Sequence, residues 1–465
     1  MSLSIHRLSI RSSALIGLES LLIVCAIAAS AFLLLGQHAS GLFLSEGGLA
    51  KALLVTAVCQ LCLYYCDLYD LSGIRDQRNL FLRLLQALGA TSIILAVIYF
   101  WFPGLVIARG VFLSASGIVV VLVVGWRMAF DWLSSHAAPS EKLLIVGTGA
   151  AAVGLARELF DRRREFGVEI VGFVASEPGL VGVALLNTGV IGTVEDIPSI
   201  VRDRTVSRVV VSLADARGKL PIDKLLQMKL ERGIIFDDLP TVYEQYTGKI
   251  AIENLRPSWL IFSQGFRKTN ALRAFKRLTD VLAAGGMLLV LGPIMALVGA
   301  LVKLTSRGPM LYHQERVGQH GRVFTIRKFR SMRADAEANT GPVWARQNDD
   351  RITTVGRMLR LTRLDELPQL WNVLVGDMSL VGPRPERPEF VDMLRQKIPF
   401  YGERHSIRPG LTGWAQVRYA YGASVEDAME KLQYDLFYLK NMSLALDVVI
   451  AFETAKIVLL RRGAA

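Results

Sequence analysis

The chain has 465 residues, a net charge of +12 and a mean hydropathy of +0.38. With 52% hydrophobic residues it is too apolar for an ordinary soluble enzyme, and its length predicts about two to four domains. From Arg267 onward, about 30 Lys and Arg stand against about 19 Asp and Glu; together with the apolar segments, this favours phosphorylated small substrates and an anionic membrane surface over nucleic acid as partners.

Four apolar stretches occupy the first quarter of the chain, at about residues 14–35, 49–68, 80–102 and 111–130. Each is long enough to cross a bilayer core of about 30 Å, which needs ~20 helical residues. The first has no small-residue cleavage site, so we do not expect a removable signal peptide. The four cysteines lie in these runs with no histidine near them, and we interpret them as packing residues rather than metal ligands or a disulfide framework: Cys25, Cys59, Cys62 and Cys66.

The charges beside these stretches predict their orientation. Basic residues precede the first stretch and lie between the second and third: Arg7, Arg11, Arg75, Arg78 and Arg83. The other two loops carry only Glu46, Lys51 and Arg109. Because loops rich in Lys and Arg stay in the cytoplasm, both termini are expected there.

Residues 142–262 have an α/β pattern. Short apolar strands are expected at "KLLIVG", "EIVGFV", "RVVVSL" and "GIIFDD", with helical patterns between them. The first strand runs into Gly147, Gly149 and Gly154, whose spacing is G-x-G-x4-G, and after the second strand only Glu177 is available as a ribose-binding acid. A nucleotide site is one interpretation. We favour the other, a Rossmann-like domain whose glycines permit tight packing between strand and helix.

A fifth apolar segment, at about residues 276–304, differs from the first four. Gly292-Pro293 lies at its middle, where proline removes a backbone donor and clashes with the preceding turn. Both flanks are basic, which predicts that both ends stay cytoplasmic. A re-entrant helix broken at Gly292 and Pro293 satisfies both features; the alternative is a fifth span with a kink. Asp280 is expected to pair with Lys276 or Arg277, because a lone charge at membrane depth is costly.

The region after this segment is basic and rich in loops. "RLTRLDELPQLWN" contains two adjacent acids, Asp365 and Glu366, whose simplest explanation is a solvated turn with local ion pairs. In "GPRPE", Arg384 lies between two prolines, which suits a guanidinium held in fixed geometry for a phosphate. "RPGLTGW" fits a binding loop and a structural turn equally well.

Taken together, these motifs resemble the bacterial sugar transferase family, the monotopic type of phosphoglycosyl transferase that acts on polyprenyl phosphate. The resemblance covers about residues 276–458 and is carried by "KRLTD", the proline-broken segment, "KFRSM", "LDELPQLWNVLVGDMSLVGPRP", "RPGLTGWAQV" and "YDLFYLKN". The four apolar stretches and the α/β pattern ahead of the matched region look like the large-membered branch of the family, which contains undecaprenyl-phosphate glucose or galactose phosphotransferases. We therefore expect a four-helix transmembrane domain (1–138), a Rossmann-like cytoplasmic domain (139–265) and a C-terminal α/β catalytic domain (266–465) with the re-entrant helix. Some small members have Ser-Pro at the membrane break, where this chain has Gly292-Pro293.

The resemblance assigns the catalytic roles to the two acids. Asp365 is expected to attack the β-phosphate of a nucleotide sugar, forming a phosphosugar–enzyme intermediate that polyprenyl phosphate then attacks. Glu366, with Asp365, is expected to hold Mg²⁺ against the diphosphate. The resemblance therefore favours a catalytic role for the two acids over the simple ion-pair explanation.

Five further residues are candidates for substrate binding. Arg360 matches a phosphate-binding position of the family, and Arg384 is assigned to the nucleotide sugar. Lys328 and Arg330 lie in "KFRSM" and are expected to hold phosphate or to tether the loop to acidic neighbours or lipid head groups. Asp435, in "YDLFYLKN", is a weaker candidate.

The resemblance also implies partners and a location. The expected substrates are a UDP-sugar, with glucose or galactose ahead of an N-acetylhexosamine, and undecaprenyl phosphate. The expected enzyme is a multi-pass homodimer in the bacterial inner membrane, with its catalytic domain on the cytoplasmic face. A membrane-tethered nucleotide-sugar dehydratase or epimerase would need a second glycine-rich loop and a Tyr-x-x-x-Lys pair after residue 265, and the sequence has neither. A non-enzymatic scaffold would leave the C-terminal motifs unexplained.

Overall fold

The structure is a computed structural model. It describes residues 10–460 except 45–46, 70–76, 108–109, 137–140, 162–166, 187, 213–220, 253–262, 264, 334–335, 337–350, 420–421 and 423. Four of the charges used to predict orientation, Arg7, Glu46, Arg75 and Arg109, lie outside the described residues. The chain forms two compact units, one over His6–Val242 and the other over Tyr243–Ala465.

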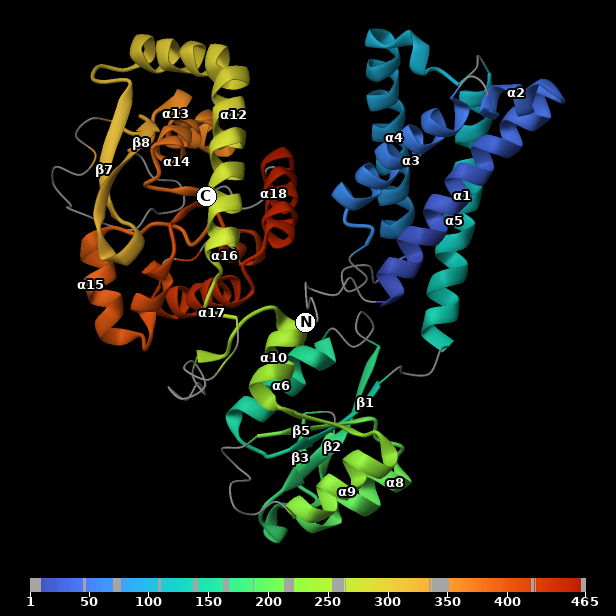
Figure 1. Cartoon of the computed structure of the whole chain (residues 1–465), viewed down its shortest axis with the longest axis vertical. Coiled ribbons are helices and arrows are strands. Elements are labelled where there is room, and N and C mark those ends of the chain that lie inside the picture. Colours follow the sequence, from blue (N-terminus) through green and yellow to red (C-terminus); the bar gives the residue numbers. More distant parts are fainter. Residues whose placement is uncertain are drawn as a thin grey trace. The chain divides into compact units, whose positions relative to one another are not determined.

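The first unit begins with the predicted apolar helices. They are α1 (Ile10–Leu35), α3 (Gly48–Tyr65), α4 (Gln77–Trp101) and α5 (Val111–His136), with the short α2 (His38–Leu44) after α1. Leu15–Leu35, Gly48–Tyr65 and Phe81–Trp101 are long and apolar enough to cross a membrane, whereas the described apolar part of α5 is the shorter Ser114–Phe130. In Figure 1 these helices form the blue and teal bundle, in which α1 packs on α5 and α3 packs on α4.

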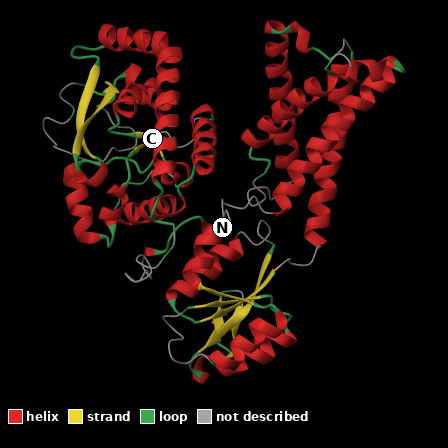
Figure 2. Cartoon of the chain, in the orientation of Figure 1, coloured by secondary structure: helices red, strands yellow, loops and turns green. Residues whose placement is uncertain are grey.

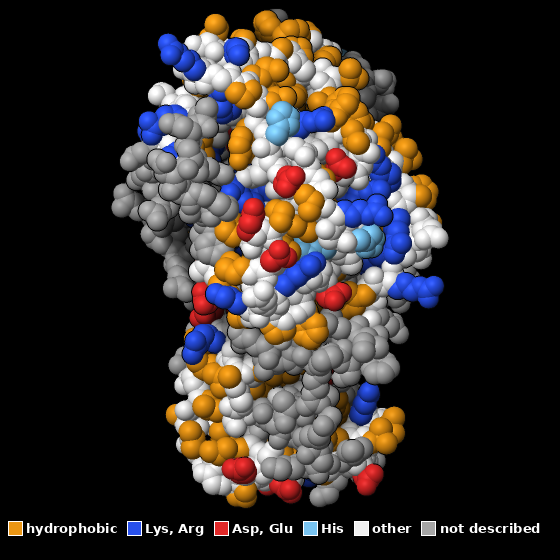
Figure 3. Space-filling view, turned by 90° about the vertical axis from the view of Figure 1, so that its left-hand side faces the viewer, with side chains coloured by type: hydrophobic (Ala, Val, Ile, Leu, Met, Phe, Trp, Pro, Cys, Tyr) orange, Lys and Arg blue, Asp and Glu red, His pale blue; other side chains and the backbone are white. Residues whose placement is uncertain are grey.

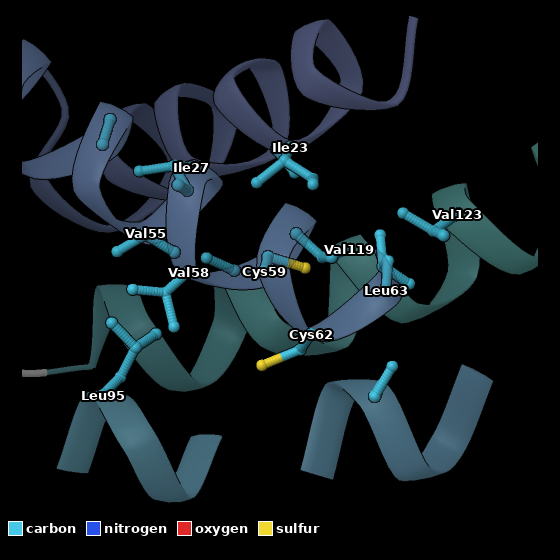
Figure 4. Packing of buried hydrophobic residues seen from close by; sticks show 14 of the residues in the cluster. Ile23, Ile27, Val55, Val58, Cys59, Cys62, Leu63, Leu95, Val119 and Val123 are labelled. Atoms are coloured by element: carbon cyan, nitrogen blue, oxygen red, sulfur yellow. The ribbon is translucent and has the colours of Figure 1, made fainter. Parts of the chain in front are cut away.

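Two kinds of contact hold the bundle together. Figure 4 shows Cys59 and Cys62 among isoleucine, leucine and valine side chains, so these two cysteines are packing residues, as the sequence predicts. A buried ion pair joins Arg127 of α5 to Glu19 of α1. Tyr69 donates a hydrogen bond to Glu19 (2.6 Å), and the Arg127 guanidinium also reaches the carbonyl of Leu68 and lies over the Tyr69 ring. Each charge in this cluster therefore has its partners within the bundle.

The same unit contains a six-stranded sheet in the order β3-β4-β2-β1-β5-β6. The strands are β1 (Glu141–Val146), β2 (Val168–Ala175), β3 (Ala184–Leu185), β4 (Thr188–Thr193), β5 (Arg208–Val211) and β6 (Ile235–Asp238). All neighbours pair in parallel except β3 and β4. The four predicted strands correspond to β1, β2, β5 and β6; the edge hairpin of β3 and β4 was not predicted. Figure 2 shows the strands flanked by helices, among them α6 (Ala150–Asp161), α8 (Ile197–Asp203) and α9 (Ile222–Arg232).

The second unit begins within α10 (Leu239–Thr247) and contains the C-terminal motifs. Its longer elements are α12 (Asn270–Thr305), β7 (Leu311–Val317), β8 (Val323–Phe329), α13 (Thr354–Leu361), α14 (Leu370–Val375), β9 (Ser379–Val381), α15 (Pro388–Lys397), β10 (Gly410–Thr412), α16 (Trp414–Arg418), α17 (Val425–Asn441) and α18 (Leu444–Leu459). β7 and β8 form an antiparallel hairpin, and β9 and β10 pair in parallel. The acidic motif lies between these two small sheets in sequence, in the 3₁₀ helix η6 (Leu364–Gln369).

α12 is the longest helix and corresponds to the fifth apolar segment. The Thr269 side chain caps its start by accepting a hydrogen bond from the amide of Leu272. Figure 1 shows two arms that meet at a sharp bend, and Pro293 lies inside the helix. Only 11% of the most apolar stretch of α12 is buried, and Leu289, Val290 and Leu304 are among the most exposed side chains of this helix. Figure 3 shows apolar side chains gathered at the top, the end where the second arm of α12 lies in Figure 1. The four long apolar helices (α1, α3, α4 and α12) mark the chain as a membrane protein.

Polar contacts fix the first arm of α12 to the rest of the unit. Lys276 pairs with Asp447 of α18 at 2.7 Å, and Arg277 donates to the carbonyls of Val373 and Leu374 at the end of α14. Asp280 accepts a hydrogen bond from the amide of Leu380 at 3.1 Å. The predicted pairing of Asp280 with Lys276 or Arg277 is therefore wrong. Those two cations contact α18 and α14, while the Asp280 carboxylate accepts from the middle residue of β9.

Residues 243–252 belong to the core of the second unit. Ile250 and Ile252 are 2% and 3% exposed and pack in the same cluster as α17. Trp414 donates its indole N–H to the carbonyl of Gly248 at 2.8 Å, and Lys440 pairs with Glu244 at 2.6 Å. This segment thus contributes apolar area and polar contacts to the unit that contains the acidic motif.

Candidate active site

The two acids lie in a 3₁₀ turn that starts with a strained residue. Arg363 precedes η6 with a φ of 56°, in the left-handed region that residues other than glycine rarely adopt. Asp365 and Glu366 follow in the first turn of η6, and η6 packs against β8. Both acids are largely buried, at 7% and 9% exposure. The acids are therefore inside the unit, and the solvated-turn explanation does not apply.

Glu366 is held by two cations from separate elements. Its Oε1 accepts hydrogen bonds from Lys328 Nζ of β8 at 2.9 Å and from Arg384 Nη2 of the loop after β9 at 2.8 Å. Burial opposes ionisation, but Arg384 and Lys328 outweigh it and hold the pKa of Glu366 well below its usual range. Burial also lowers the pKa of Lys328, and Glu366 opposes that effect. Glu366 is thus a carboxylate neutralised by its neighbours.

Asp365 has a different environment from its neighbour. Burial, followed by the charge of Glu366, raises the pKa of Asp365 to about 6. Its Oδ1 is buried and has no hydrogen-bond partner among the residues that the structure describes. A buried polar oxygen without a partner costs free energy, so native proteins keep few of them. The turn therefore presents one carboxylate paired with two cations and one with a buried oxygen that is available for a further interaction.

Arg360 and Arg330 both lie near the end of β8, because Arg330 directly follows this strand and Arg360 contacts Ser331, the next residue. The Thr353 side chain caps α13 by accepting from the amide of Gly356, whose backbone lies directly against Ser331. From α13, Arg360 donates to the hydroxyl of Ser331 at 3.2 Å, and its charge favours ionised Asp365. Arg330 is 5% exposed and donates to the carbonyl and hydroxyl of Ser306, at the end of α12. Lys328 and Arg360 thus act on the acids, whereas the described contacts of Arg330 are at the end of α12.

The loop after β9 packs closely against the "RPGLTGW" segment, and glycines on both sides allow this approach. The amide of Gly382 donates to the carbonyl of Thr412 at 2.8 Å, and the amide of Gly410 donates to the carbonyl of Pro383 at 2.9 Å. A Cβ atom at Gly410 or at Gly413 would clash with the backbone of Gly382, and one at Gly382 would lie 2.9 Å from the amide nitrogen of Gly410. "RPGLTGW" therefore has a structural role: its glycines allow close packing against the loop that carries Arg384.

Asp435 is linked to this loop through Arg404, and its described contacts do not include the two acids. It is 1% exposed and pairs with Arg404, whose Nη2 is 2.7 Å and whose Nε is 3.0 Å from its Oδ2. The Ser424 and Asp427 side chains cap the start of α17, the helix that carries Asp435. The charge of Asp435 is thus used within the protein, by Arg404.

Two residues that support the site are absent from the sequence prediction. Asn372 of α14 donates to the carbonyl of Thr325 at 2.8 Å and accepts from the amide of Arg327 at 3.3 Å, which joins the acidic segment to β8. Arg404 contacts both Asp435 and the backbone of Arg384. An asparagine inside an apolar "LWNVLV" run is a weak signal of a buried polar link. Arg404 carries no comparable signal, because its partners are 20 and 31 residues away.

Comparisons with known proteins agree with this arrangement. Residues 271–461 match the family described as bacterial sugar transferase, and residues 65–228 match a CoA-binding domain. The chain is 44% identical over 224 residues to a UDP-N-acetylgalactosamine-undecaprenyl-phosphate N-acetylgalactosaminephosphotransferase of Aeromonas hydrophila, covering 48% of this chain and 52% of that protein. It is 32% identical to an undecaprenyl-phosphate glucose phosphotransferase of Komagataeibacter xylinus, covering 70% of this chain and 60% of that protein.

A third relative is matched over more of its own length. It is a UDP-glucose:undecaprenyl-phosphate glucose-1-phosphate transferase of Escherichia coli (strain K12), 30% identical over 330 residues, which is 70% of each chain. For the first two relatives, the chain spans only between half and two thirds of the protein. The matched region includes the acid pair, Lys328, Arg360 and Arg384. The chain belongs to the bacterial sugar transferase family.

Proposed function

We propose that this chain is a phosphoglycosyl transferase that moves a sugar-1-phosphate from a UDP-sugar to undecaprenyl phosphate, giving undecaprenyl diphospho-sugar and UMP. Membership of the family supports the reaction class, and the relatives' names supply both substrates. A first membrane step in exopolysaccharide or O-antigen synthesis is the role that we propose for it.

The acid pair supports a two-step mechanism. A carboxylate oxygen of Asp365 attacks the β-phosphorus, the bond from that phosphorus to the bridging oxygen breaks, and UMP leaves with the electron pair. An oxygen of the lipid phosphate then attacks the same phosphorus, and the Asp365 carboxylate leaves. Arg384 and Lys328, which Glu366 neutralises in the free enzyme, are placed to exchange that carboxylate for phosphate oxygens. Arg360 adds a third cation beside Asp365.

The residues present fit Mg²⁺. Among the described residues there is no cluster of three or more His, Cys, Asp and Glu, but Mg²⁺ in phosphate-transfer sites usually takes one or two carboxylates together with substrate phosphates and water. The buried Oδ1 of Asp365 and the carboxylate of Glu366 supply hard oxygen donors of that kind. When bound, the ion would neutralise charge on the diphosphate.

The donor sugar is proposed at the level of its class. The relative with 44% identity is named for UDP-N-acetylgalactosamine, and the two with lower identity are named for glucose. We therefore propose a UDP-hexose or a UDP-N-acetylhexosamine. Radiolabelled UDP-glucose, UDP-galactose and UDP-N-acetylgalactosamine, each tested alone on membranes with undecaprenyl phosphate, would distinguish them.

We propose that α12 is re-entrant and that the second unit lies on the cytoplasmic face of the inner membrane. The sharp bend in α12, the proline inside this helix, the exposed apolar surface of both arms and the basic residues at both ends support this placement. A map of cysteine labelling that finds residues after Ser306 accessible only from the periplasm would contradict it. Replacing Pro293 by leucine is expected to restore a straight helix and lower activity.

For the middle sheet we propose a Rossmann-like domain that mediates assembly, including a homodimer. The order β4-β2-β1-β5-β6 of its parallel strands supports this fold. The match to a CoA-binding domain keeps a nucleotide ligand as the alternative. Size measurement of the protein in detergent, with and without CoA or other nucleotides, tests both.

The observation that carries the proposed function is the contrast between the two adjacent acids, one clamped by two cations and one with a buried oxygen left without a partner. The test is a single-turnover assay. Enzyme, UDP-sugar and Mg²⁺ without lipid are expected to release up to about one equivalent of UMP, because the intermediate needs its acceptor to turn over. Asp365→Asn should abolish this release and still bind the UDP-sugar.

Two results would change the proposal. UMP release that persists in Asp365→Asn would place the nucleophile elsewhere. Absence of release by the wild type, together with sequential kinetics once lipid is present, would mean that undecaprenyl phosphate attacks the donor directly. Glu366→Gln is the matched control at the neighbouring position, and it should raise the Mg²⁺ concentration needed for any remaining rate.

A further inference from the structure

We propose that Arg404 is a positioning residue: held by Asp435, it fixes the backbone of Arg384 so that the Arg384 guanidinium is oriented for the nucleotide sugar. The inference rests on the proposed function for the identity of that ligand. It assigns a role to the buried Arg404–Asp435 ion pair, which lies outside the acid pair and meets Arg384 through the backbone carbonyl of that residue.

The first observation is the set of bonds made by Arg404. Its side chain is 6% exposed, and Nη2 donates to the carbonyl oxygen of Arg384 at 3.0 Å. Nε and Nη2 also bind the Asp435 carboxylate, and Nη1 donates to the hydroxyl of Tyr401 at 2.7 Å. Every nitrogen of the guanidinium is therefore in use. Because Asp435 and Tyr401 hold the fork in place, Arg404 presents a fixed N–H to the Arg384 carbonyl.

The second observation is that each carbonyl from residue 383 to residue 386 is bound by a residue outside the loop. The Pro383 carbonyl accepts from the amide of Gly410, the Pro385 carbonyl accepts from Arg316, and the Glu386 carbonyl accepts from the amide of Val317. Arg404 completes this series at residue 384. It is the member of the series that acts on the residue whose side chain reaches Glu366.

The local backbone explains why this bond matters. The rings of Pro383 and Pro385 fix their own φ angles, and Pro385 also confines Arg384 to extended conformations. Within that extended region φ and ψ of Arg384 and ψ of Pro383 can still vary, and they set the direction of the Arg384 carbonyl group. A fixed donor at that carbonyl narrows this remaining range. Since Arg384 is 38% exposed and its side chain is long, its geometry depends on this rigid base.

The test is a double-mutant cycle on the complete protein in detergent, with KM for the UDP-sugar as the main measurement. Arg404→Lys keeps the charge opposite Asp435 but lacks the fork that reaches both partners. We expect a rise in KM of about tenfold with a much smaller change in kcat, as one hydrogen bond from a charged group is lost. In an Arg384→Lys background, Arg404→Lys should add little, because the geometry that it supports is already lost.

Two further variants make the test decisive. Glu430→Gln is the matched control, because Glu430 lies on the same helix as Asp435 and pairs with Lys249 at 2.7 Å, away from the loop; it should leave KM unchanged in both backgrounds. Tyr401→Phe removes one bond to Arg404 and keeps the shape of the ring. It should raise KM by about two- to threefold, again only when Arg384 is present, and it decides the question if Arg404→Lys does not fold.

Additive effects of Arg404→Lys and Arg384→Lys, or equal effects of Arg404→Lys and Glu430→Gln, would overturn the inference, because they would mean that Arg404 only stabilises the unit. Hydrogen exchange across residues 380–390 measures the loop without any substrate, and it should be faster in Arg404→Lys and unchanged in Glu430→Gln. Failure of the wild type to release UMP from any UDP-sugar even when undecaprenyl phosphate is present would instead overturn the proposed function. Unchanged exchange would overturn the inference alone.

Discussion

The protein contains two buried clusters in which acidic side chains pair with basic ones. The clusters differ in whether every carboxylate oxygen has a partner. In the helix bundle, Glu19 is paired with Arg127 and accepts from Tyr69, and the arginine also reaches a backbone carbonyl. In the second unit, Oε1 of Glu366 is paired with Lys328 and Arg384, but the adjacent Asp365 has a buried oxygen without a partner among the described residues. A saturated cluster resists change and suits a structural role. An unsaturated carboxylate beside several cations is costly to keep, and a substrate or metal ion can supply the missing partner.

The largest expected effect separates rate from stability at Asp365. Asp365→Asn should lower the rate of UMP release by roughly 10⁴-fold, because a neutral amide is a poor nucleophile. Its melting temperature in detergent should equal or exceed that of the wild type, since the substitution removes the charge of a buried carboxylate whose Oδ1 lacks a hydrogen-bond partner among the described residues. A clear fall in melting temperature would mean that Asp365 has a structural role, which would remove the contrast with Glu19.

Glu19 should show the reverse behaviour. Glu19→Gln leaves Arg127 buried without its counter-charge and should cost about 3–5 kcal/mol of stability. Replacing both residues by leucine should restore most of that loss, because no charge is then left unpaired. Thermal unfolding in detergent measures both variants. The folded fraction should release UMP at the wild-type rate, and a specific loss of rate would show that the bundle cluster acts on the reaction.

Removal of the segment before α12 should have an intermediate effect on stability, smaller than that of Glu19→Gln. A chain starting at Leu239 retains Ile250, Ile252 and the pair of Glu244 with Lys440, whereas a chain starting at Asn270 loses them. The shorter chain should be about 2–4 kcal/mol less stable, from the lost apolar burial less the entropy of ordering the segment. If both are kept folded in detergent, both should release UMP. Equal unfolding midpoints would mean that residues 239–269 contribute nothing to this unit.

The smallest expected effect concerns Asn372, which links α14 to β8. Asn372→Asp keeps the shape of the side chain but turns a donor into an acceptor, facing the carbonyl of Thr325. It should lower stability by about 1–3 kcal/mol, the usual cost of an unsatisfied buried group. If Asn372→Asp unfolds at the wild-type midpoint, the link between the acidic segment and β8 is not required.

Local patterns predict much of this fold. Apolar runs identify α1, α3, α4 and α12, and short apolar strands ending at glycine or polar residues identify β1, β2, β5 and β6. These succeed because burial and bilayer thickness act on consecutive residues. The hairpin of β3 and β4 escapes because β3 has only two residues, too few for a periodic pattern.

The partners of charged residues are much harder to predict. Lys276 pairs with Asp447, 171 residues away, so inspection of neighbouring residues assigns Asp280 the wrong partner. Asp435 is a weaker candidate for substrate binding from its motif, and its contact with Arg404 depends on how α17 packs in three dimensions. The strained backbone of Arg363 has no composition signal either. Motifs identify which residues matter, and tertiary packing decides what each of them touches.

Three glycines at the Arg384 loop, Gly382, Gly410 and Gly413, are required for folding rather than for the reaction. Since a side chain at Gly410 or Gly413 would meet the backbone of Gly382, no flexible neighbour can move aside to accept it. These positions should stay glycine in any chain that folds this way, whether or not it is an enzyme. A homologous sequence with all three glycines but no acid at the position of Asp365 is therefore expected to be a pseudoenzyme, which keeps the architecture and has lost the reaction.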